Sequence, residues 1–449
     1  MAPTDYDRAF RRLAALTDYE TMATVPYHER TYGLSRARAL LDDLGRPAER
    51  LPVLQVVGSK GKGTTTAAAA AILQAAGLRV GSYFSPHLAH PSERILLAGR
   101  PLRGRVFARA VDRVLPRALR RSEGERPTFF ELMTAVALLL FEEEGADAVV
   151  LEAGMGGRLD ATTAARRSGV LLTSVSLDHT AQLGRTTALI AAEKAATATC
   201  AVPFYSAVTA STPAGRVVAR ICRKARAPLS VAGRDWRVSR ARTGLDGSGP
   251  WTRFDLALRG RGSLQSLELP MLGVHQAQNA ALAAAALLDL ARGGLLVVDE
   301  GAVRHGLGSL RVPARLEVLG RRPLLVLDGA HNGASMRAAV AAVRAVTDPR
   351  GRLLVVFAAN RDKDLRGMLR AFRGRARVYA TEVANPRRAR AADLVRLARA
   401  EGLTATPASS PRTALESALA AARPEDAVLV AGSMYLAGAV RVTWSSDSD

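Results

Sequence analysis

Cysteine is scarce in this 449-residue chain. Cys200 and Cys222 are too few for a disulfide framework or a cysteine-ligated zinc site, which fits a reducing cytoplasm. The opening residues, MAPTDYDRAFRRL, lack the apolar core of a secretion signal. The most apolar stretch, 280–290, is short and contains Asp289, so it cannot span a membrane. We expect a cytoplasmic protein without a membrane segment.

Aromatic and acidic residues are also few. Aromatic residues make up 5% of the chain, and 41 acidic residues against 63 basic ones give a net charge of +22. Such a charge can serve nucleic-acid binding, but the arginines are scattered, no zinc-finger spacing occurs and few side chains could stack on bases. We therefore expect no nucleic-acid partner. The basic surface either reflects composition alone or attracts small anionic substrates.

Apolar runs alternate with helix-forming segments along the chain. They cover 53–57, 148–151, 170–175, 324–327, 353–357, 378–380 and 427–430. This alternation predicts an α/β fold with mostly parallel sheets flanked by helices. Polar and glycine residues follow each run, as GSKGKGT, EAGMGGRLDAT, SLDHT, DGAHN, AANRDKD, TEVANPR and AGSMY. Because ligands bind beyond the carboxyl ends of parallel strands, these segments predict the site.

The length predicts two or three domains. Residues 233–269 read as antiparallel strands with turns at Asp246-Gly247 and at 260–262. The segment GLGSLRVPARLE, 306–317, places glycine and proline between a helix and a new strand. We therefore expect a boundary near residue 311, with a larger phosphate-binding domain at 1–310 and a smaller α/β domain at 311–449.

The stretch 53–77 predicts a strand, a glycine-rich turn and a helix from Thr64 to Ala76. Glycine lets the backbone approach a ligand, and a helix N-terminus attracts anions. We expect phosphate to bind here, at Gly58, Ser59, Lys60, Gly61, Lys62, Gly63, Thr64 and Thr65. The spacing departs from G-x-x-x-x-G-K-[ST], because Gly63 separates the lysine from the hydroxyl residue. The alternative is an ordinary turn with solvated lysines.

Thirteen motifs occur in a characteristic order. They are YGLSRARALLDDLG (32–45), GSKGKGTT, YFSPHL (83–88), ERI (93–95), TFFE (128–131), LEAGMGGRLDAT (151–162), LDHTAQLGRT (177–186), IAAEKA (190–195), GVHQAQN (273–279), VPARLE, LDGAHN, RDKD and AGSMYL. Together they resemble the folylpolyglutamate synthase and dihydrofolate synthase family of the Mur ligase superfamily. The resemblance covers nearly the whole chain. It implies a P-loop-containing, mostly parallel sheet domain of the Mur ligase central type, followed by a smaller Rossmann-like α/β domain.

The resemblance implies an ATP- and magnesium-dependent ligase that adds L-glutamate to dihydropteroate, to folates, or to both. The substrate carboxylate would attack the γ-phosphate, and the glutamate amine would then attack the acyl phosphate and release phosphate. Positioning and electrostatics would be the protein's part in this chemistry. The resemblance also implies a monomer that closes two domains around ATP. A related Mur-type ligase with another acceptor, and a non-catalytic basic nucleotide- or nucleic-acid-binding protein, are the alternatives.

The resemblance also assigns residues to the reaction. The catalytic groups would be Lys62, Glu152, His179, Lys194 and His331. Two magnesium ions would be held by Thr64, Ser85, Glu152, His179 and Lys194, the last as a carbamate, whose formation needs a neutral amine and so favours burial. Ordinary roles are also open to the proposed metal ligands: a helix cap for Thr64, a turn for Ser85, an ion pair for Glu152 and a structural place for His179. Lys194 could be paired with Glu193 or simply solvated.

The remaining assignments concern the nucleotide and the acid substrate. Asn279, Arg315 and Asp328 would contact the nucleotide, with helix capping as the alternative for Asn279. The acid would meet Thr128, Phe129, Phe130, Leu159, Asp160 and Ala161, since phenylalanine can stack on a heterocycle and aspartate can accept from an aminopyrimidine. Either phenylalanine could equally be a core residue. The chain departs from the family pattern at Thr163, Ala196 and Gly333, and at Lys60, where many bacterial members carry asparagine.

Overall fold

A computed structural model describes residues 4–19, 22, 25, 27–374 and 376–446. The chain forms two compact units. The first comprises Met1–Ser239, Asp255–Leu267 and Gln278–Leu310, and the second Arg240–Phe254, Glu268–Ala277 and Arg311–Asp449. The extreme ends of the two predicted domains, 1–3 and 447–449, lie outside the described residues.

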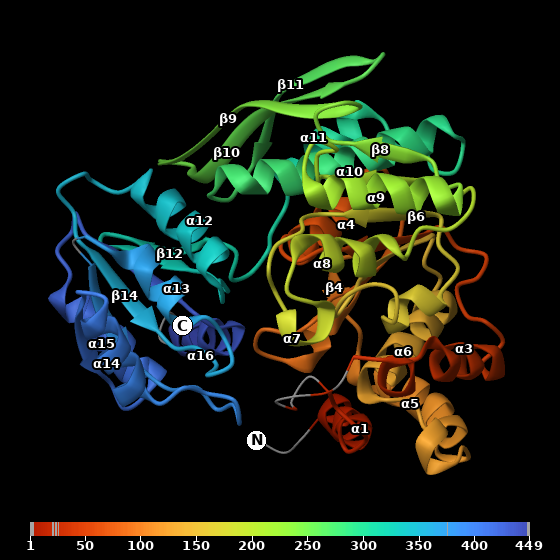
Figure 1. The fold of residues 1–449 in the computed structure, drawn as a ribbon, viewed down its shortest axis with the longest axis horizontal. Coiled ribbons are helices and arrows are strands. Elements are labelled where there is room, and N and C mark those ends of the chain that lie inside the picture. Colours follow the sequence, from red (N-terminus) through yellow and green to blue (C-terminus); the bar gives the residue numbers. More distant parts are fainter. Residues whose placement is uncertain (1–3, 20–21, 23–24, 26, 375, 447–449) are drawn as a thin grey trace. The chain divides into compact units, whose positions relative to one another are not determined.

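The first unit is built on an eight-stranded sheet in the order β4-β3-β2-β5-β1-β6-β7-β8 (Figure 1). Its strands are β1 (Val53–Val57), β2 (Val80–Tyr83), β3 (Ile95–Leu97), β4 (Arg100–Pro101), β5 (Ala148–Glu152), β6 (Gly169–Leu172), β7 (Phe204–Ser206) and β8 (Leu229–Val231). All neighbours from β2 to β8 pair in parallel, while β3 and β4 pair antiparallel at the edge. The predicted mostly parallel sheet is confirmed.

Helices pack on this sheet and form two apolar cores. One core joins β1, β2, β3 and β5 to α1 (Asp5–Ala14), α3 (Leu34–Asp43), α5 (Gly104–Leu119) and α6 (Phe129–Glu143). The other joins β1, β6 and β7 to α8 (Thr187–Ala195) and α9 (Pro213–Ala225). The remaining helices of this half of the chain are α2 (Glu29–Tyr32), α4 (Lys62–Ala75), α7 (Thr180–Leu183), α10 (Val274–Arg292) and α11 (Glu300–Gly308). Burial of the apolar sides of these helices supplies most of the driving force for the fold.

The region 233–269 forms a separate three-stranded sheet in the order β11-β10-β9. The strands are β9 (Trp236–Asp246), β10 (Gly249–Leu258) and β11 (Gly262–Leu269), and their residues are divided between the two units. The two connections fall where the sequence predicted turns, after Asp246 and at 259–261.

The second unit contains a six-stranded sheet in the order β12-β13-β17-β14-β15-β16. The strands are β12 (Glu317–Arg321), β13 (Leu324–Leu327), β14 (Leu353–Phe357), β15 (Ala376–Ala380), β16 (Thr404–Pro407) and β17 (Ala427–Ala431). Only β12 pairs antiparallel. The helices are α12 (Gly333–Arg344), α13 (Leu365–Leu369), α14 (Ala391–Ala400), α15 (Pro411–Ala421) and α16 (Met434–Ser446). This is the α/β unit that the alternation of apolar runs predicted.

No helix in the described ranges is both long and apolar enough to cross a membrane.

Candidate active site

The sheet of the first unit gathers the predicted motifs at one edge. Tyr83 is in register with Leu151, and Val56 with Glu152, so the ends of β2, β5 and β1 lie side by side. On the other side of β1, Val57 is in register with Leu172, the last residue of β6. The segments that follow these four strands therefore meet at the same edge, as expected for a ligand site of a parallel sheet.

The phosphate loop passes from β1 into α4 through Gly61. This glycine is the N-cap of α4 at φ 86°, a left-handed conformation that glycine adopts without strain, and no side chain caps the helix. Helix α4 begins at Lys62, two residues before the predicted start, so Thr64 lies inside the helix and is not its cap. The N-terminus of α4 thus presents its positive end to the loop.

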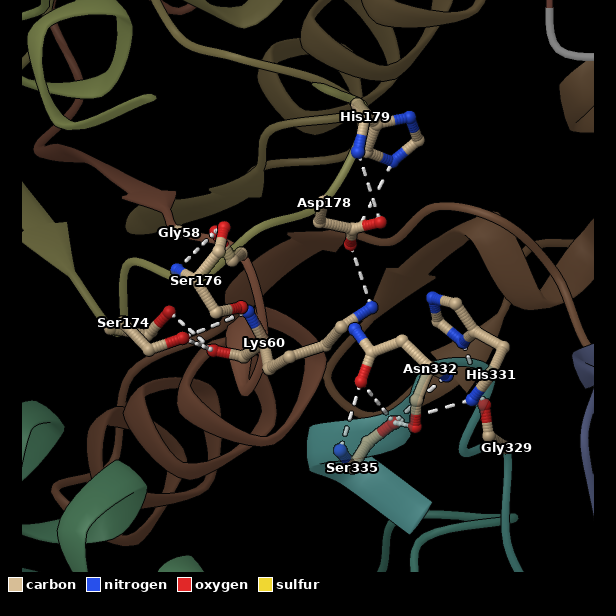
Figure 2. Close-up of polar contacts among 12 residues, drawn as sticks. Gly58, Lys60, Ser174, Ser176, Asp178, His179, Gly329, His331, Asn332 and Ser335 are labelled. Carbon is tan, nitrogen blue, oxygen red and sulfur yellow. Dashed lines mark hydrogen bonds and ion pairs between the residues drawn. The ribbon is translucent and has the colours of Figure 1, made fainter. Parts of the chain in front are cut away.

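The segment 173–176 holds the loop in place. Lys60 N–H donates to Ser174 Oγ (2.9 Å), and the Lys60 carbonyl accepts from Thr173 Oγ1 (2.6 Å) and from Ser174 Oγ (2.9 Å). Ser59 N–H donates to the Ser174 carbonyl (2.8 Å), and Ser59 Oγ accepts from Ser176 N–H (3.1 Å). Figure 2 shows the contacts between Lys60 and Ser174. The apolar run predicted as strand up to residue 175 therefore ends early, and its last residues clamp the phosphate loop.

Two groups at this edge suit a divalent cation that prefers oxygen ligands. Thr64 is 1% exposed, and its buried hydroxyl has no hydrogen-bond partner in the structure. Such an unpaired buried group is costly unless a ligand satisfies it. Glu152 is buried at the end of β5, and its Oε2 accepts Ser85 N–H at 3.3 Å. Hydroxyl and carboxylate oxygens of this kind fit magnesium.

No group of three or more His, Cys, Asp or Glu side chains within the described ranges is arranged to hold a metal ion. The predicted ligand set is of another kind, because it relies on the hydroxyls of Thr64 and Ser85 and on a carbamate of Lys194.

Lys194 is almost fully buried, at 3% exposure, at the end of α8. Its Nζ donates to the carbonyls of Gly58 (3.0 Å) and Gly156 (3.5 Å). Burial lowers the pKa of the Lys194 ammonium to about 7; Lys62 and, more weakly, Lys60 add to this effect, while Asp178 and Asp160 oppose it.

Glu193 does not pair with Lys194. Instead Glu193 accepts from Arg158 Nε at 3.1 Å, so the predicted alternative of a lysine paired with its neighbour is wrong.

His179 follows Asp178 at the start of α7 and has a left-handed backbone, with φ 48°. Asp178 Oδ1 accepts the His179 N–H at 3.1 Å, and Asp178 Oδ2 lies 4.0 Å from His179 Nε2. The same Oδ2 lies 2.7 Å from Lys60 Nζ (Figure 2). Asp178 therefore links the phosphate loop to the histidine that the sequence singled out.

The predicted acid-substrate residues differ in their exposure. Thr128 is the N-cap of α6, in a capping box with Glu131. Phe129 is 2% exposed and packs edge-on against Phe10, with ring centroids 5.4 Å apart. Phe130 is partly exposed and covers Gly154, where an added Cβ would lie 2.9 Å from its ring. Of the two phenylalanines, Phe130 is therefore the more exposed.

Asp160 organises the loop 153–160 from within. It is 6% exposed, and its oxygens accept Met155 N–H (3.0 Å), Thr162 N–H (3.0 Å) and Thr162 Oγ1–H (2.5 Å). Burial raises the pKa of its carboxyl, against these hydrogen bonds. Leu159 and Ala161 on either side are also buried.

Gln55 supports the same loop from β1. Its Nε2 donates to Thr162 Oγ1 and to Thr163 Oγ1, each at 2.7 Å. Thr162 gives its hydroxyl proton to Asp160, and Thr163 gives its own to the Gly157 carbonyl (2.7 Å). Because both protons are committed, the hydroxyls can only accept from Gln55, which fixes the orientation of the amide. Thr163, a departure from the family pattern, is thus part of this network, in which the buried Gln55 Oε1 has no hydrogen-bond partner among the described residues.

Asn279 lies within α10, so the predicted alternative of helix capping is wrong. Its carbonyl accepts from Thr65 Oγ1 at 3.1 Å, and a Cβ added to Gly61 would lie 2.2 Å from its Oδ1. The asparagine therefore contacts the phosphate loop itself.

The second unit presents its own polar edge after β13. Asp328 is buried, and its two oxygens accept the N–H groups of Leu316 (2.9 Å) and Ala330 (2.8 Å). Burial raises the pKa of this carboxyl, and Arg315 opposes the shift. His331 Nδ1 donates to the Gly329 carbonyl at 2.8 Å (Figure 2), which holds the ring against the loop that follows β13.

Sequence reasoning missed some residues that shape the site. Thr173 and Ser174 were included in the apolar run 170–175, and Ser176 was given no role although it begins the polar segment SLDHT. Gln55 is the single polar residue in the run VLQVV, and a buried polar residue in a central strand requires hydrogen-bond partners. That signal could have identified it.

Comparison with known families agrees with this architecture. The Mur ligase middle domain matches residues 56–287, and the Mur ligase glutamate ligase domain matches 314–434. A dihydrofolate synthase/folylpolyglutamate synthase of Escherichia coli is 32% identical over 90% of this chain and 89% of its own length. The chain belongs to this family of Mur ligases. The resemblance found in the sequence is confirmed.

Two relatives of this chain are longer than it is. A probable bifunctional folylpolyglutamate synthase/dihydropteroate synthase of Halobacterium salinarum is 37% identical over 92% of this chain but 49% of the relative. A similar protein of Haloferax volcanii is covered to 48%. The chain thus spans about half the length of these two archaeal relatives.

Solved structures share the fold. Escherichia coli FolC in complex with DHPP and ADP has a TM-score of 0.82 at 29% identity, with 100% of both chains covered. A bifunctional folylpolyglutamate synthase/dihydrofolate synthase from Yersinia pestis, complexed with AMPPNP and Mn ion, has a TM-score of 0.81 at 29% identity, with 99% of this chain and 100% of the other covered.

Proposed function

We propose that this chain is an ATP-dependent ligase that adds L-glutamate to dihydropteroate, to a folate, or to both, through an acyl phosphate. The observation that carries the proposal is the cluster of Lys62, Lys194, Glu152 and the unpaired Thr64 hydroxyl around a clamped phosphate loop. Family membership supports it, since the glutamate ligase domain matches the second unit and relatives carry both synthase names.

ATP would lie on the loop 58–65. Backbone N–H groups and the positive end of α4 would face the phosphates, and Lys62, the first residue of α4, would contact the β- and γ-phosphates. The sequence assigns Asn279, Arg315 and Asp328 to the same nucleotide. For Asp328 the hydrogen bonds to two backbone N–H groups favour a role in shaping the loop that carries His331.

Magnesium fits the oxygen groups of the first unit. Thr64, Ser85 and Glu152 would hold it, together with His179 and a carbamate on Lys194. A bound divalent cation neutralises the charge that develops on the transferring phosphoryl group. Manganese in the Yersinia pestis structure supports a divalent ion in the family.

The carbamate on Lys194 is a separate proposal. A pKa of about 7 leaves much of the Lys194 amine neutral near neutral pH, and only the neutral amine adds carbon dioxide. Native mass measurement under retained carbon dioxide should find the added group on the wild-type chain and not on a Lys194→Met variant. Equal masses in the carbonated and the degassed sample would contradict it.

The acid substrate would bind beside the loop 153–161. Phe130 would stack on the heterocycle, while Thr128 and Phe129 position the start of α6, and Leu159, Asp160 and Ala161 form the supporting wall. His331 would lie near the transferred phosphate.

The oligomeric state, the compartment and the partners belong to the same proposal. We propose a monomer in the cytoplasm, with small-molecule partners and no nucleic acid. Cys200 and Cys222 are free thiols, which supports a reducing compartment.

Product formation tests the function. Purified protein is mixed with Mg-ATP and L-glutamate, then with dihydropteroate or tetrahydrofolate in turn, and phosphate release is followed together with product mass. We expect release with at least one acid and a product heavier by one glutamyl residue. A Lys62→Met variant that retains the circular dichroism spectrum should lose this turnover. No release with either acid, from protein that binds ADP, would refute the substrate assignment and leave another acceptor of a Mur-type ligase.

A further inference from the structure

Lys60 is the second lysine of the phosphate loop, and its side chain points to Asp178 (Figure 2). The Nζ–Oδ2 distance is 2.7 Å, and the two side chains are 23% and 7% exposed. Asp178 is thus a nearly buried carboxylate with a cation bonded to it. A buried charge of this kind is strongly disfavoured when its partner is removed.

The backbone of Lys60 is held in place by hydrogen bonds. Its backbone N–H and carbonyl are both bonded to the segment 173–174, with distances of 2.6–2.9 Å. Asp178 lies farther along the same segment. Lys60 is therefore attached to the segment 173–178 at two points. Its backbone is bonded to residues 173 and 174, and its ammonium is paired with Asp178.

Asp178 passes this restraint to His179. Its Oδ1 accepts the His179 N–H at 3.1 Å, and its Oδ2 faces His179 Nε2 at 4.0 Å. The left-handed backbone of His179, with φ 48°, is uncommon for a residue with a side chain and persists only where the surroundings impose it. The hydrogen bond that the His179 N–H donates to the Asp178 carboxylate is such a constraint.

Composition makes the identity of residue 60 informative. The chain contains five lysines, at positions 60, 62, 194, 224 and 363, among 63 basic residues. Three of the five act on one another electrostatically, since Lys60 and Lys62 both lower the pKa of Lys194. Where arginine serves nearly everywhere else, lysine at 60 places a compact ammonium, rather than a planar guanidinium, beside Asp178.

We propose that Lys60 is a positioning residue, which holds Asp178 and through it His179 on the phosphate side of the site. The inference rests on the proposed role of His179 at the metal or the phosphates. It differs from the simpler view that Lys60 contacts the phosphates directly, as Lys62 is proposed to do.

Metal-linked nucleotide binding separates these two roles. ADP affinity is measured by calorimetry with EDTA and with excess Mg²⁺, for wild type, Lys60→Met, Asp178→Asn and the double variant. Lys224→Met, on the exposed side of α9, is the matched control and should behave as wild type. These measurements do not depend on ligase turnover, so they remain informative if the proposed acid substrate is wrong.

We expect each single variant to lose about 5- to 50-fold of the affinity that Mg²⁺ adds, and the double variant to lose no more than either single one, because interacting residues are not additive. Metal-free ADP affinity should change by less than about threefold, since a positioning residue does not bond the phosphates. In the ligase assay the same variants should lower kcat more than they raise KM for ATP.

Two results would overturn the proposal. A loss of at least about tenfold in metal-free ADP affinity, the same with and without Asp178→Asn, would make Lys60 a direct phosphate contact. If the losses of Mg²⁺-dependent ADP affinity in the two single variants multiplied in the double variant, Lys60 and Asp178 would act independently and the ion pair would not couple them. If Lys60→Met does not fold, Lys60→Arg keeps the charge. It should retain the coupling with Asp178 but only part of the Mg²⁺ effect, and full wild-type behaviour would refute the geometric argument.

Discussion

Removal of the buried ammonium at position 194 should change how stability depends on pH. The pKa of Lys194 is lowered from 10.5 to about 7 in the folded chain, so between these values the unfolded chain binds more protons than the folded one. The free energy of unfolding therefore rises with pH across this window. Below about pH 7 the side chain is charged in both states and the cost of burying it is fully present.

The size of the effect follows from the shift. One pKa unit corresponds to 1.36 kcal/mol, so raising the pH from about 6 to about 9 should stabilise the wild-type fold by roughly 2–3 kcal/mol through this one group. Lys194→Met removes the titration while it keeps the apolar stem. Its own dependence on pH should be smaller by that amount, and at pH ~6 the variant should be the more stable of the two.

Scanning calorimetry at the two pH values, in degassed buffer with EDTA, measures this difference without carbamate or metal. For a unit of this size, with an unfolding entropy of about 0.6 kcal/mol/K, we expect the wild type to gain about 3–5 °C more than the variant on going to the higher pH. Lys224→Met provides the control for the loss of an exposed lysine. Equal shifts in wild type and Lys194→Met would refute the reasoning, since the ammonium would then not be penalised by burial.

Three further substitutions probe the loops around the site. Gly61→Ala places a Cβ at φ 86° and 2.2 Å from Asn279 Oδ1, so it should cost at least about 1–2 kcal/mol in urea unfolding and weaken ADP binding; unchanged values would show that the loop adapts. Thr64→Val removes an unpaired buried hydroxyl, so the ligand-free fold should be as stable as wild type or about 1 kcal/mol more stable, while the gain in ADP affinity from Mg²⁺ falls; retention of that gain would exclude Thr64 as a ligand. Gln55→Leu removes the donor for two threonine hydroxyls, so it should lower the free energy of unfolding by about 1–2 kcal/mol and raise the KM for the acid substrate. A change in the KM for ATP alone would contradict the role of Gln55 in supporting the loop 153–160.

The regular elements were largely predictable, because apolar runs of five residues are strong signals. The run 53–57 coincides with β1, and 324–327 with β13. The strands β7 and β8 were not anticipated, since three residues carry too little pattern. The start of α4 was placed two residues late, because composition does not show that Gly61 adopts the left-handed conformation that ends the turn.

Two departures from the family pattern have a backbone explanation. Ala196 ends α8 at φ −64°, a conformation open to any residue, so no glycine is required there. Gly333 is the first residue of α12, and a Cβ on it would lie 3.0 Å from the Gly367 carbonyl. The absence of a side chain therefore suits the close approach of the next loop.

The site itself was predictable only as a set of positions. Glycines, lysines and acids after strands identify the edge of the sheet, yet the charge of each group depends on contacts that sequence does not display. Lys62 and Lys194 are both lysines of the predicted machinery, and burial lowers the pKa of Lys194 to about 7, against the hydrogen bonds that its ammonium donates to the carbonyls of Gly58 and Gly156. Lys60 keeps a carboxylate beside it, Asp178, and that pairing limits how much positive charge the loop presents before the nucleotide arrives. The three lysines of the phosphate site thus have three environments: one at the start of a helix, one in an ion pair, and one buried with a lowered pKa. Substitutions that exchange these environments should therefore be more damaging than their net charge suggests.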